Sequence, residues 1–364
     1  MSEARRKILQ MLAEGKITVA QSEELLSAVE KDNQESNRKC SFGEGISGFA
    51  KSVQKQIREA MKKAEPPSHE FKSRIKEFGG WMQNVMGSMV SEFGQFRSEP
   101  VDGVNVEFCV PEPEGFSQCH VCLIENPFGS VTVREGPAFS LKLLGRISNA
   151  AMAGQPPNLW FNQHGLSIEG ETLRIGFDRG SPAKAVLEME LSLPAGIALR
   201  FRSVSASINV KGPFKVEALK TVSGDVVLVD THLSNASLET VSGDIRLDGG
   251  SASCEGISTS GDFRCQGTHL EKCHLQSISG DLQLSSPEVD ESSLIKMNTT
   301  SGDIVVERIK GHWAQVEANS RTGNVKVRWE GTVDPGLRHG TKLESGQPGA
   351  LFAAETVSGD IKFD

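Results

Sequence analysis

An eight-residue phrase recurs seven times between residues 221 and 363 of this chain. The copies read TVSGDVVL, TVSGDIRL, STSGDFRC, SISGDLQL, TTSGDIVV, SRTGNVKV and TVSGDIKF. The intervals between their glycines are 19, 18, 19, 22, 21 and 36 residues, for Gly224, Gly243, Gly261, Gly280, Gly302, Gly323 and Gly359. A period in this range is typical of stacked supersecondary units that cannot bury their apolar faces alone.

The residues around each glycine alternate in polarity as in a strand with one buried face. Ile245 and Leu247 follow the acid of the second copy and enclose Arg246, while Leu238 and Val241 precede its glycine. A period of two residues is the side-chain period of a β-strand. Two short strands should therefore flank each corner, and we expect its glycine to supply a positive φ. Ser or Thr one and three places before every glycine predicts columns of hydroxyls bonding between coils.

Two repeat architectures compete at this level. A propeller blade needs four strands and about 40 residues, which is roughly twice the interval found here. We therefore predict a mainly β fold, a single-stranded β-helix (β-solenoid) of about 18–22-residue coils over residues 101–364, preceded by an α-helical N-terminal region. The 36-residue interval before Gly359 is rich in Gly and Pro. It predicts a loop, or one degraded coil, near the C-terminal end.

The corner residues are interpreted as structural rather than catalytic. Six copies keep all three letters: Ser223, Gly224, Asp225, Ser242, Gly243, Asp244, Ser260, Gly261, Asp262, Ser279, Gly280, Asp281, Ser301, Gly302, Asp303, Ser358, Gly359 and Asp360. Calcium-binding β-rolls use a nine-residue Gly/Asp repeat, so a column of cations is an alternative. Each coil offers one acid, whereas calcium needs six or more oxygens, and we predict no cofactor and no metal.

The first hundred residues predict helices. Residues 1–32 carry apolar residues at helical spacing, with Gly15 as a stop and Thr18 with Gln21 as a capping box. They predict a helical hairpin for oligomerisation or partner docking. Residues 40–98 predict an amphipathic helical segment. Its second half carries a possible membrane or partner face: Phe71, Ile75, Phe78, Trp81, Met82, Val85, Met89 and Phe93.

The amphipathic segment leaves two interpretations open. Nine basic and six acidic side chains lie between residues 42 and 97, and a basic amphipathic helix with Trp and Phe can lie in a membrane interface. Met and Phe at helical spacing more often pack on the rest of the chain or on a partner helix. The predicted partners are a protein or a second copy through residues 1–97, with possible peripheral membrane contact.

Composition sets limits on the partner and on the compartment. The chain holds 39 Lys and Arg against 47 Asp and Glu, a formal charge of −8, which argues against a nucleic-acid partner. Seven cysteines, an odd number, favour reduced thiols in a cytoplasm. No apolar run spans a bilayer, and no secretory signal pattern follows the first residues. The expected location is cytoplasmic, possibly peripheral to the membrane.

The chain carries few patterns typical of catalytic or metal-binding sites. Cys119 and Cys122 have the spacing of half a zinc site, yet residues three apart in a strand point to opposite faces. No nucleophile elbow, phosphate loop or dinucleotide fingerprint occurs. Some β-helices cleave polysaccharides, so an enzyme is the less favoured alternative. It would need acids and bases clustered across neighbouring coils.

Two stretches resemble known bacterial families. The segment Ile8 to Val29, with Leu12-Ala-Glu-Gly-Lys-Ile-Thr18 and Glu23-Glu-Leu-Leu26, resembles the short helical N-terminal domain of YvlB/LiaX proteins. From about Asn126 to the Ser-Gly-Asp repeats, the chain resembles the putative-adhesin family of β-strand repeat proteins. The resemblance implies a bacterial envelope-stress or surface-associated protein built on a β-helix, with no catalytic residues to carry over.

These observations together predict a non-enzymatic scaffold or interaction protein. Its solenoid would present a long polar surface, and its helical N-terminal region would dock a partner. A self-polymerising structural protein and a surface adhesin are the alternatives, because open solenoid ends expose unpaired strand edges.

Overall fold

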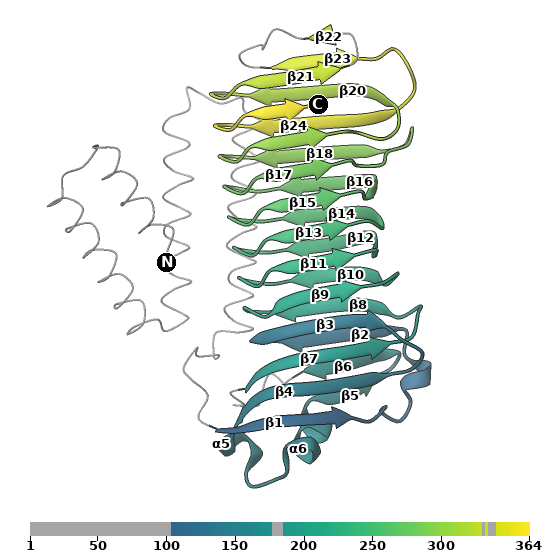
Figure 1. Ribbon diagram of the computed structural model, residues 1–364, viewed down its shortest axis with the longest axis vertical. Coiled ribbons are helices and arrows are strands. Elements are labelled where there is room, and N and C mark those ends of the chain that lie inside the picture. Colours follow the sequence, from purple (N-terminus) through teal and green to yellow (C-terminus); the bar gives the residue numbers. More distant parts are fainter. Residues whose placement is uncertain (1–102, 177–184, 330–331, 334–339) are drawn as a thin grey trace, which may run out of the picture.

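The computed structural model describes residues 103–176, 185–329, 332–333 and 340–364, which form two long sheets (Figure 1). Sheet A contains, in spatial order, β1 (Gly103–Val110), β4 (Ser140–Ser148), β7 (Ala185–Leu193), β3 (Gly129–Glu135), β9 (Ser207–Lys211), β11 (Val226–Val229), β13 (Ile245–Asp248), β15 (Phe263–Gln266), β17 (Leu282–Ser285), β19 (Ile304–Glu307), β25 (Ile361–Phe363), β21 (Val325–Trp329) and β22 (Thr332–Val333).

Most coils that give a strand to sheet A give their other strand to sheet B. Its spatial order is β23 (Thr341–Glu344), β20 (Trp313–Ser320), β24 (Ala350–Thr356), β18 (Leu294–Thr299), β16 (His269–Gln276), β14 (Ser251–Ile257), β12 (His232–Glu239), β10 (Lys215–Lys220), β8 (Ala198–Ser203), β2 (Val121–Asn126), β6 (Thr172–Gly176) and β5 (Leu166–Glu169). Each repeat thus gives one strand to each sheet. The predicted mainly β, solenoid-like stack is confirmed.

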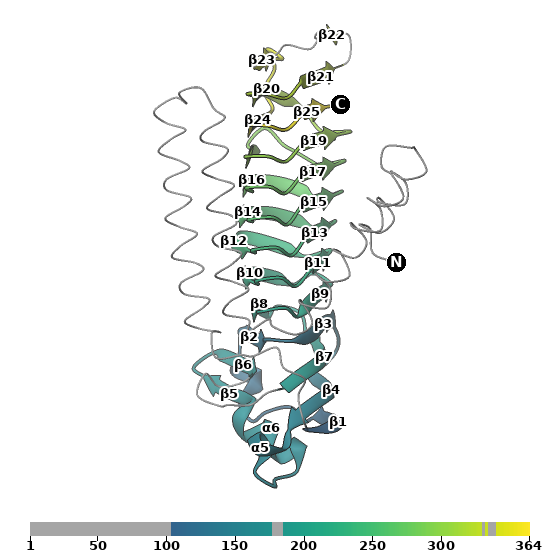
Figure 2. The same ribbon diagram turned by 90° about the vertical axis from the view of Figure 1, so that its left-hand side faces the viewer.

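The core lies between the two sheets, which Figure 2 shows from the side. Val226, Ile245, Phe263 and Leu282 are direct partners in the successive parallel strands β11, β13, β15 and β17, and each is at most 1% exposed. Burying one such side chain contributes about 1.5–3 kcal/mol. The alternation seen in the sequence therefore fixes the register, because a shift by one residue would turn the apolar row outward.

The last two coils are stacked in reverse order. β18 and β19 pair with β24 and β25, the last coil in the sequence, while β20 and β21 lie outside that coil. Accordingly, the C-terminus lies within the stack in Figure 1, below the end that β22 and β23 form. The 36-residue interval is therefore more than a loop or a degraded coil. It includes β22 and β23, and it carries the chain back into the stack.

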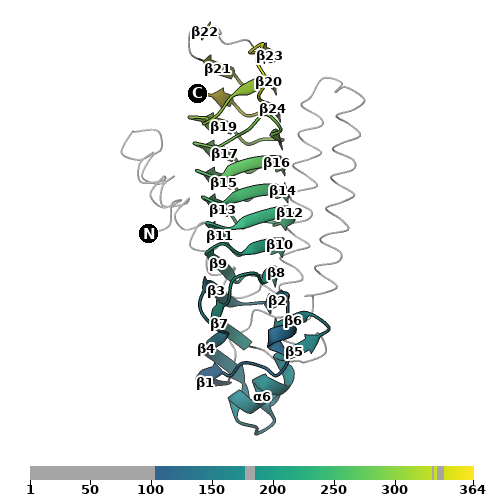
Figure 3. The same cartoon turned by 90° about the vertical axis from the view of Figure 1, so that its right-hand side faces the viewer.

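The opposite end has a base of different geometry. β4 pairs antiparallel with β1 and β7, and the coil formed by β2 and β3 is inserted between β6/β7 and β8/β9. The short helices α5 (Asn149–Met152) and α6 (Pro157–His164) lie at this end, both labelled in Figure 2 and α6 also in Figure 3. Phe161 of α6 is fully buried and meets Phe108 of β1 edge to face. Antiparallel β1 and β4 depart from the coils expected here.

The predictions for the N-terminal region lie outside the described residues. These are the hairpin over residues 1–32, the amphipathic segment over residues 40–98 and its face from Phe71 to Phe93. In the described part of the chain, no helix has the length and apolarity to span a bilayer.

The Ser-Gly-Asp ladder as candidate functional site

The motif glycines are required by close approach between coils. A Cβ on Gly261 would lie 2.0 Å from the carbonyl oxygen of Gly243, and one on Gly280 would lie 2.1 Å from that of Gly261. Real side chains do not tolerate such contacts. The same holds at Gly302, Gly359 and Gly323, each against the preceding glycine in the stack. None of the seven has a φ in the left-handed region, so the expected positive φ is wrong.

The hydroxyl three places before each glycine closes the corner within its own coil. In all seven copies it accepts a hydrogen bond from the glycine N–H, at 2.8–3.2 Å. Toward the C-terminal end it also reaches the neighbouring coil. There Thr299 donates to the carbonyl of Gly280 at 3.2 Å and Thr356 to that of Gly302 at 3.1 Å.

The hydroxyl directly before each glycine donates to a carbonyl of the preceding coil in the stack, the one nearer the base. Ser260 donates to the carbonyl of Val241 and Ser279 to that of Thr259, at 3.3 and 3.2 Å. The remaining five copies make the equivalent bond, at 3.0–3.5 Å. The hydroxyl three places before the glycine therefore satisfies the glycine N–H at the turn. The hydroxyl directly before it adds a second bond to a carbonyl that already accepts the N–H of the same residue.

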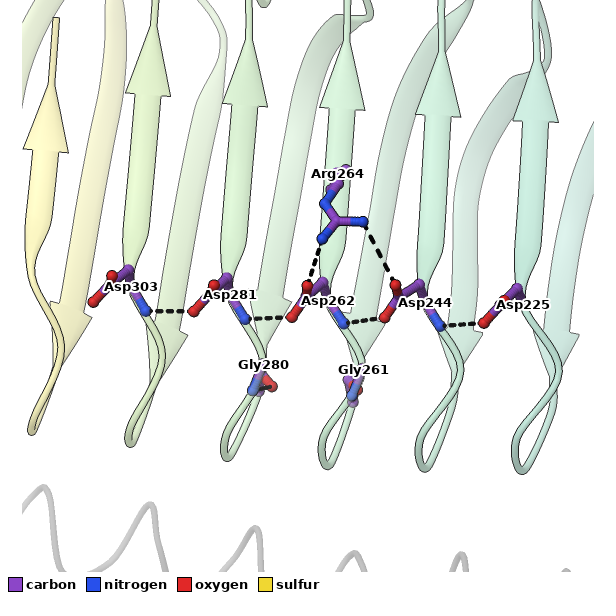
Figure 4. Close-up of polar contacts among 10 residues, drawn as sticks. Asp225, Asp244, Gly261, Asp262, Arg264, Gly280, Asp281 and Asp303 are labelled. Carbon is purple, nitrogen blue, oxygen red and sulfur yellow. Dashed lines mark hydrogen bonds and ion pairs between the residues drawn. The ribbon is translucent and has the colours of Figure 1, made fainter. Parts of the chain in front are cut away.

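The corner acids form a ladder that runs along the stack (Figure 4). Oδ1 of Asp244 accepts the backbone N–H of Asp262 at 2.9 Å, and Oδ1 of Asp262 accepts that of Asp281 at 2.8 Å. The same bond joins Asp225 to Asp244, Asp281 to Asp303, Asp303 to Asp360 and Asp360 to Asn324. Arg264 contacts both Asp244 and Asp262, at 3.5 and 2.7 Å. Each carboxylate thus replaces a ladder bond between strands.

This geometry leaves the acids little capacity for a shared cation. One oxygen of each carboxylate in the ladder is used by an N–H group of the next coil, and each coil supplies a single acid at this corner. A calcium ion takes six to eight oxygens. Within the described residues, no group of three or more His, Cys, Asp or Glu side chains could hold a metal ion.

Cys119 and Cys122, which have the spacing of half a zinc site, lie in environments typical of structural thiols. Cys122 points into the core from β2, where burial strongly raises the pKa of its thiol. Cys119 is buried, its pKa is also raised by burial, and its thiol faces the carbonyl of Gly115 at 3.8 Å. A zinc ligand must be a thiolate, so these environments suit core thiols. Cys265 is likewise a core side chain, 3% exposed, as its place in the repeat predicted.

The structure brings together a pair of thiols in adjacent coils that the sequence analysis did not predict. Cys254 of β14 is the direct partner of Cys273 in β16. A hydrogen bond to Cys273, together with burial, raises the pKa of Cys254 well above its ordinary value. The thiol of Cys273 donates to the carbonyl of Ala252 at 3.1 Å. The repeat phase could have shown this pair, because both residues lie seven places before a motif glycine.

The outer face of sheet A carries parallel rows of polar side chains. Beside the corner acids runs a row that includes Arg246, Arg264 and Lys362. A second row holds acids, so that Arg246 pairs with Asp248 at 2.8 Å and Lys362 with Glu307 at 2.8 Å. The sequence had shown no partner acid for the arginines outside the corner column. In the structure, the partner acid of Arg246 is Asp248, two residues further along the same strand.

A denser ionic cluster lies on sheet B near the base. Glu125 is 7% exposed and contacts Arg174 at 2.6 Å and Arg202 at 3.3 Å. Nearby, hydrogen bonds from Lys215 and Arg200 hold the pKa of Glu217 below its ordinary value. These residues come from strands that are neighbours only through the stacking order β6, β2, β8 and β10. Their spacing in the sequence gave no signal.

Comparison with known proteins gives a family match and weak structural neighbours. Residues 167–364 match the family described as Toastrack DUF4097, and residues 3–34 match a SHOCT-like domain. No curated protein matches the chain.

The solved structures similar to this chain include three bacterial proteins. Two are described as putative adhesins. The one from Parabacteroides merdae has 11% identity over 57% of this chain and 90% of that chain, with a TM-score of 0.34. The one from Parabacteroides distasonis has 12% identity, the same coverage and a TM-score of 0.34. The third is described as a putative cell adhesion protein from Clostridium sporogenes, with 10% identity over 71% and 98% and a TM-score of 0.24.

Proposed function

Because this chain belongs to the Toastrack DUF4097 family, whose match spans residues 167–364, we propose that it is a non-enzymatic scaffold or interaction protein. Its stacked coils hold two broad polar faces in fixed register for binding other proteins. The N-terminal residues 1–97 supply a second docking region, for a partner or another copy. In a bacterial envelope-stress pathway, such a molecule would act as a docking component.

One observation carries this proposal. The Ser, Thr, Gly and Asp groups that recur most often in the sequence are engaged in bonds that hold one coil to the next. A catalytic acid or base must reach a substrate, whereas these carboxylates accept backbone N–H groups of the neighbouring coil. The repeat is therefore built to make a long rigid surface, and binding is the function that such a surface supports best.

The polar rows of sheet A are the candidate binding face in the described region. Arg246 and Arg264 are exposed, and each holds its guanidinium beside carboxylates of its own or an adjacent coil. Rows of alternating charge favour a complementary charged surface and set the orientation of a partner rather than the affinity alone. The spacing between equivalent side chains is that of adjacent strands, about 4.8 Å.

The experiment compares proteins captured by four versions of the tagged chain. They are the full chain, the chain without residues 1–97, an Arg246→Glu/Arg264→Glu variant, and a control variant, Lys272→Glu/Lys296→Glu, on sheet B. Membrane fractionation of the first two versions tests peripheral membrane contact. We expect specific partners to be lost on removal of residues 1–97 or on charge reversal of sheet A, and to be kept by the control. A capture profile identical for all four versions would contradict the scaffold function.

A self-polymerising rod is less well supported than a discrete particle. Both ends of the stack carry antiparallel strands, β1 and β5 at the base and β22 and β23 at the other end. Atypical end units of this kind close repeat proteins against further growth.

A further inference from the structure

The last coil of the sequence fills a slot between two other coils. This terminal coil, residues 350–364, contains β24 and β25. We define the slot as the space between the coil of β18 and β19 and the coil of β20 and β21. Both walls of the slot are formed by residues that precede the terminal coil in the chain.

The terminal coil is bonded to the wall formed by β18 and β19. Its backbone bonds there include Leu351 N–H to the carbonyl of Ser293, at 2.9 Å, and Asp364 N–H to that of Val306, at 2.9 Å. The Asp360 N–H donates to the carboxylate of Asp303 at 2.8 Å. Lys362 adds an ion pair with Glu307 at 2.8 Å.

The opposite wall is bonded to the terminal coil in the same manner. Ile361 N–H donates to the carbonyl of Asn324 at 2.9 Å, and Thr322 N–H donates to that of Val357 at 3.0 Å. The Ser320 hydroxyl donates to the carbonyl of Gly359 at 2.7 Å. Without the terminal coil, both walls would expose unpaired strand edges, which readily accept another strand.

The slot is selective for a segment with the sequence of the terminal coil. A Cβ at position 359 would lie 1.9 Å from the carbonyl oxygen of Gly302, so the slot requires glycine at its corner. Inside, Phe352 and Phe363 meet edge to face at 5.9 Å, and both are at most 2% exposed. A strand that fits must therefore combine the corner glycine with two aromatic residues at the matching inward positions.

The terminal coil also differs from its neighbours in how it is connected. A coil in the middle of the stack, such as that of β14 and β15, is joined along the chain to the coils on both of its sides. The terminal coil is joined along the chain to the other coils only through the residues between β21 and β24, a stretch that includes β22 and β23. It can therefore leave the slot without opening the coil of β18 and β19 or any coil nearer the base, and only the outer coil of β20 and β21, which pairs with it, must move.

We propose that the terminal coil is exchangeable between copies of this chain, so that two molecules fill each other's slots and form a coil-swapped dimer. The inference is independent of the proposed scaffold function. A swapped coil makes the same hydrogen bonds, ion pair and aromatic contact as the resident one. The balance between the closed monomer and the dimer is therefore set by chain concentration and by the connecting segment, as in other domain-swapped proteins.

The test places single cysteines on neighbouring strands of different molecules. Val305 of β19 and Lys362 of β25 are direct partners across one wall of the slot. Chains carrying Val305→Cys or Lys362→Cys, with Cys40 and Cys109 replaced by serine, are mixed and held just below their unfolding temperature. A short bis-maleimide is then added. We expect covalent dimers at about tenfold or more above a mid-stack control, because a mid-stack coil cannot exchange without opening the stack on both of its sides, whereas the terminal coil displaces only the outer coil of β20 and β21.

The matched control pairs Arg246→Cys on one chain with Arg264→Cys on the other, which are direct partners in β13 and β15. A chain with both Val305→Cys and Lys362→Cys should cross-link internally and shows that the thiols are within reach. No dimer above the control, with internal cross-linking intact, would overturn the exchange. Failure of internal cross-linking would overturn it as well, since the terminal coil would then not occupy the slot.

A second variant tests the same inference without cysteines. Removing residues 334–339 shortens the connection that returns the terminal coil to its own slot, and shortened hinges favour swapping. We expect light scattering to give a doubled mass for this variant and not for a variant with six residues added at the same place. A shortened chain that keeps the mass of the parent would contradict the proposal.

Discussion

At the corner of each coil, serine, glycine and aspartate contact the neighbouring coil through three different groups. The hydroxyl donates to a carbonyl, the missing Cβ allows close backbone approach, and the carboxylate accepts an N–H, as at Ser260, Gly261 and Asp262. The same contacts recur along the stack. Each of the three corner positions therefore needs its own residue type for a different physical reason, which explains why Ser-Gly-Asp recurs in the sequence.

Replacing a corner glycine should be far more costly than replacing a glycine elsewhere in the same coil. In Gly261→Ala the new Cβ would lie 2.0 Å from a backbone oxygen, so two coils must separate, and we expect a loss of about 3–5 kcal/mol. The control is Gly267→Ala, where φ is +61° and no atom lies within 4 Å. It should cost about 1–2 kcal/mol. Urea unfolding of the two variants measures both losses of stability. Equal losses in Gly261→Ala and Gly267→Ala would contradict the close-approach explanation.

The acid ladder should depend on an acceptor oxygen rather than on negative charge. Asp281 accepts the N–H of Asp303 at 2.8 Å. Asp281→Ala removes that acceptor and should cost about 1 kcal/mol. Asp281→Asn keeps the acceptor and removes repulsion between stacked carboxylates, so it should match or exceed the parent at low salt.

The salt dependence of this pair of variants is the control. Screening weakens repulsion between exposed charges, so any advantage of Asp281→Asn should shrink at high salt while the loss in Asp281→Ala persists. Asn and Ala variants that are equally unstable would show that the charge itself holds the ladder.

The sequence predicted which residues lie at the corners, but it did not predict why glycine is required. A position requires glycine either because its φ is left-handed or because a neighbouring backbone leaves no room for a Cβ. Both requirements appear in the sequence as the same residue. Gly261 belongs to the second class, whereas Gly267, outside the motif, belongs to the first. Only the distance between neighbouring coils, which the sequence does not contain, distinguishes these two requirements.

At the scale of strands and coils, alternation predicted the stack but not the order of its coils. Val226, Ile245 and Phe263 form a continuous buried row because each strand keeps the same two-residue period. The octets containing Gly323 and Gly359 are nearly equivalent in that pattern, so either could stack on the octet of Gly302. In the structure the octet of Gly359 takes that position, and the octet of Gly323 stacks on it from outside.

The reversed order makes an earlier coil depend on a later one. Deleting residues 350–364, or introducing Gly359→Val into the full chain, should expose β20 and β21 while the coils of β13 to β17 stay protected. Hydrogen exchange measures this, because strands that lose their neighbours lose amide protection. We expect residues 313–329 to approach the exchange rates of an unfolded segment.

A substitution on the outer face of the same coil is the matched control. Leu351 is 43% exposed, so Leu351→Ala should leave the protection of residues 313–329 unchanged. Persistent protection of that segment in the deletion variant would show that β20 and β21 are held by other contacts.

At the scale of the whole molecule, the described region is a stack with different closures at its two ends. The base uses antiparallel β1 and β4 with α6, and the other end uses β22 and β23. The repeats predicted the middle of this assembly. They could not predict the ends, because a closing element must break the repeat and so leaves no periodic signal.

The closed ends predict an assembly whose mass is small and bounded. Light scattering over a hundredfold range of concentration should give a mass for the parent chain that never exceeds that of a small closed oligomer such as the dimer. Leu343→Pro removes a backbone donor from β23, which pairs with β20, and proline is excluded from regular ladders. This variant should uncover the edge of β20 and grow in mass with concentration. Open-ended growth of the parent chain would support a filament.

The reversed coils also have a consequence for synthesis on the ribosome. A stack whose coils followed sequence order could fold from its base upward as the polypeptide emerges. Here residues 313–329 emerge while the position beneath them is vacant, and they must wait until residues 350–364 have been translated. The last two coils of the stack therefore form together, after a delay that the order of the repeats along the chain imposes.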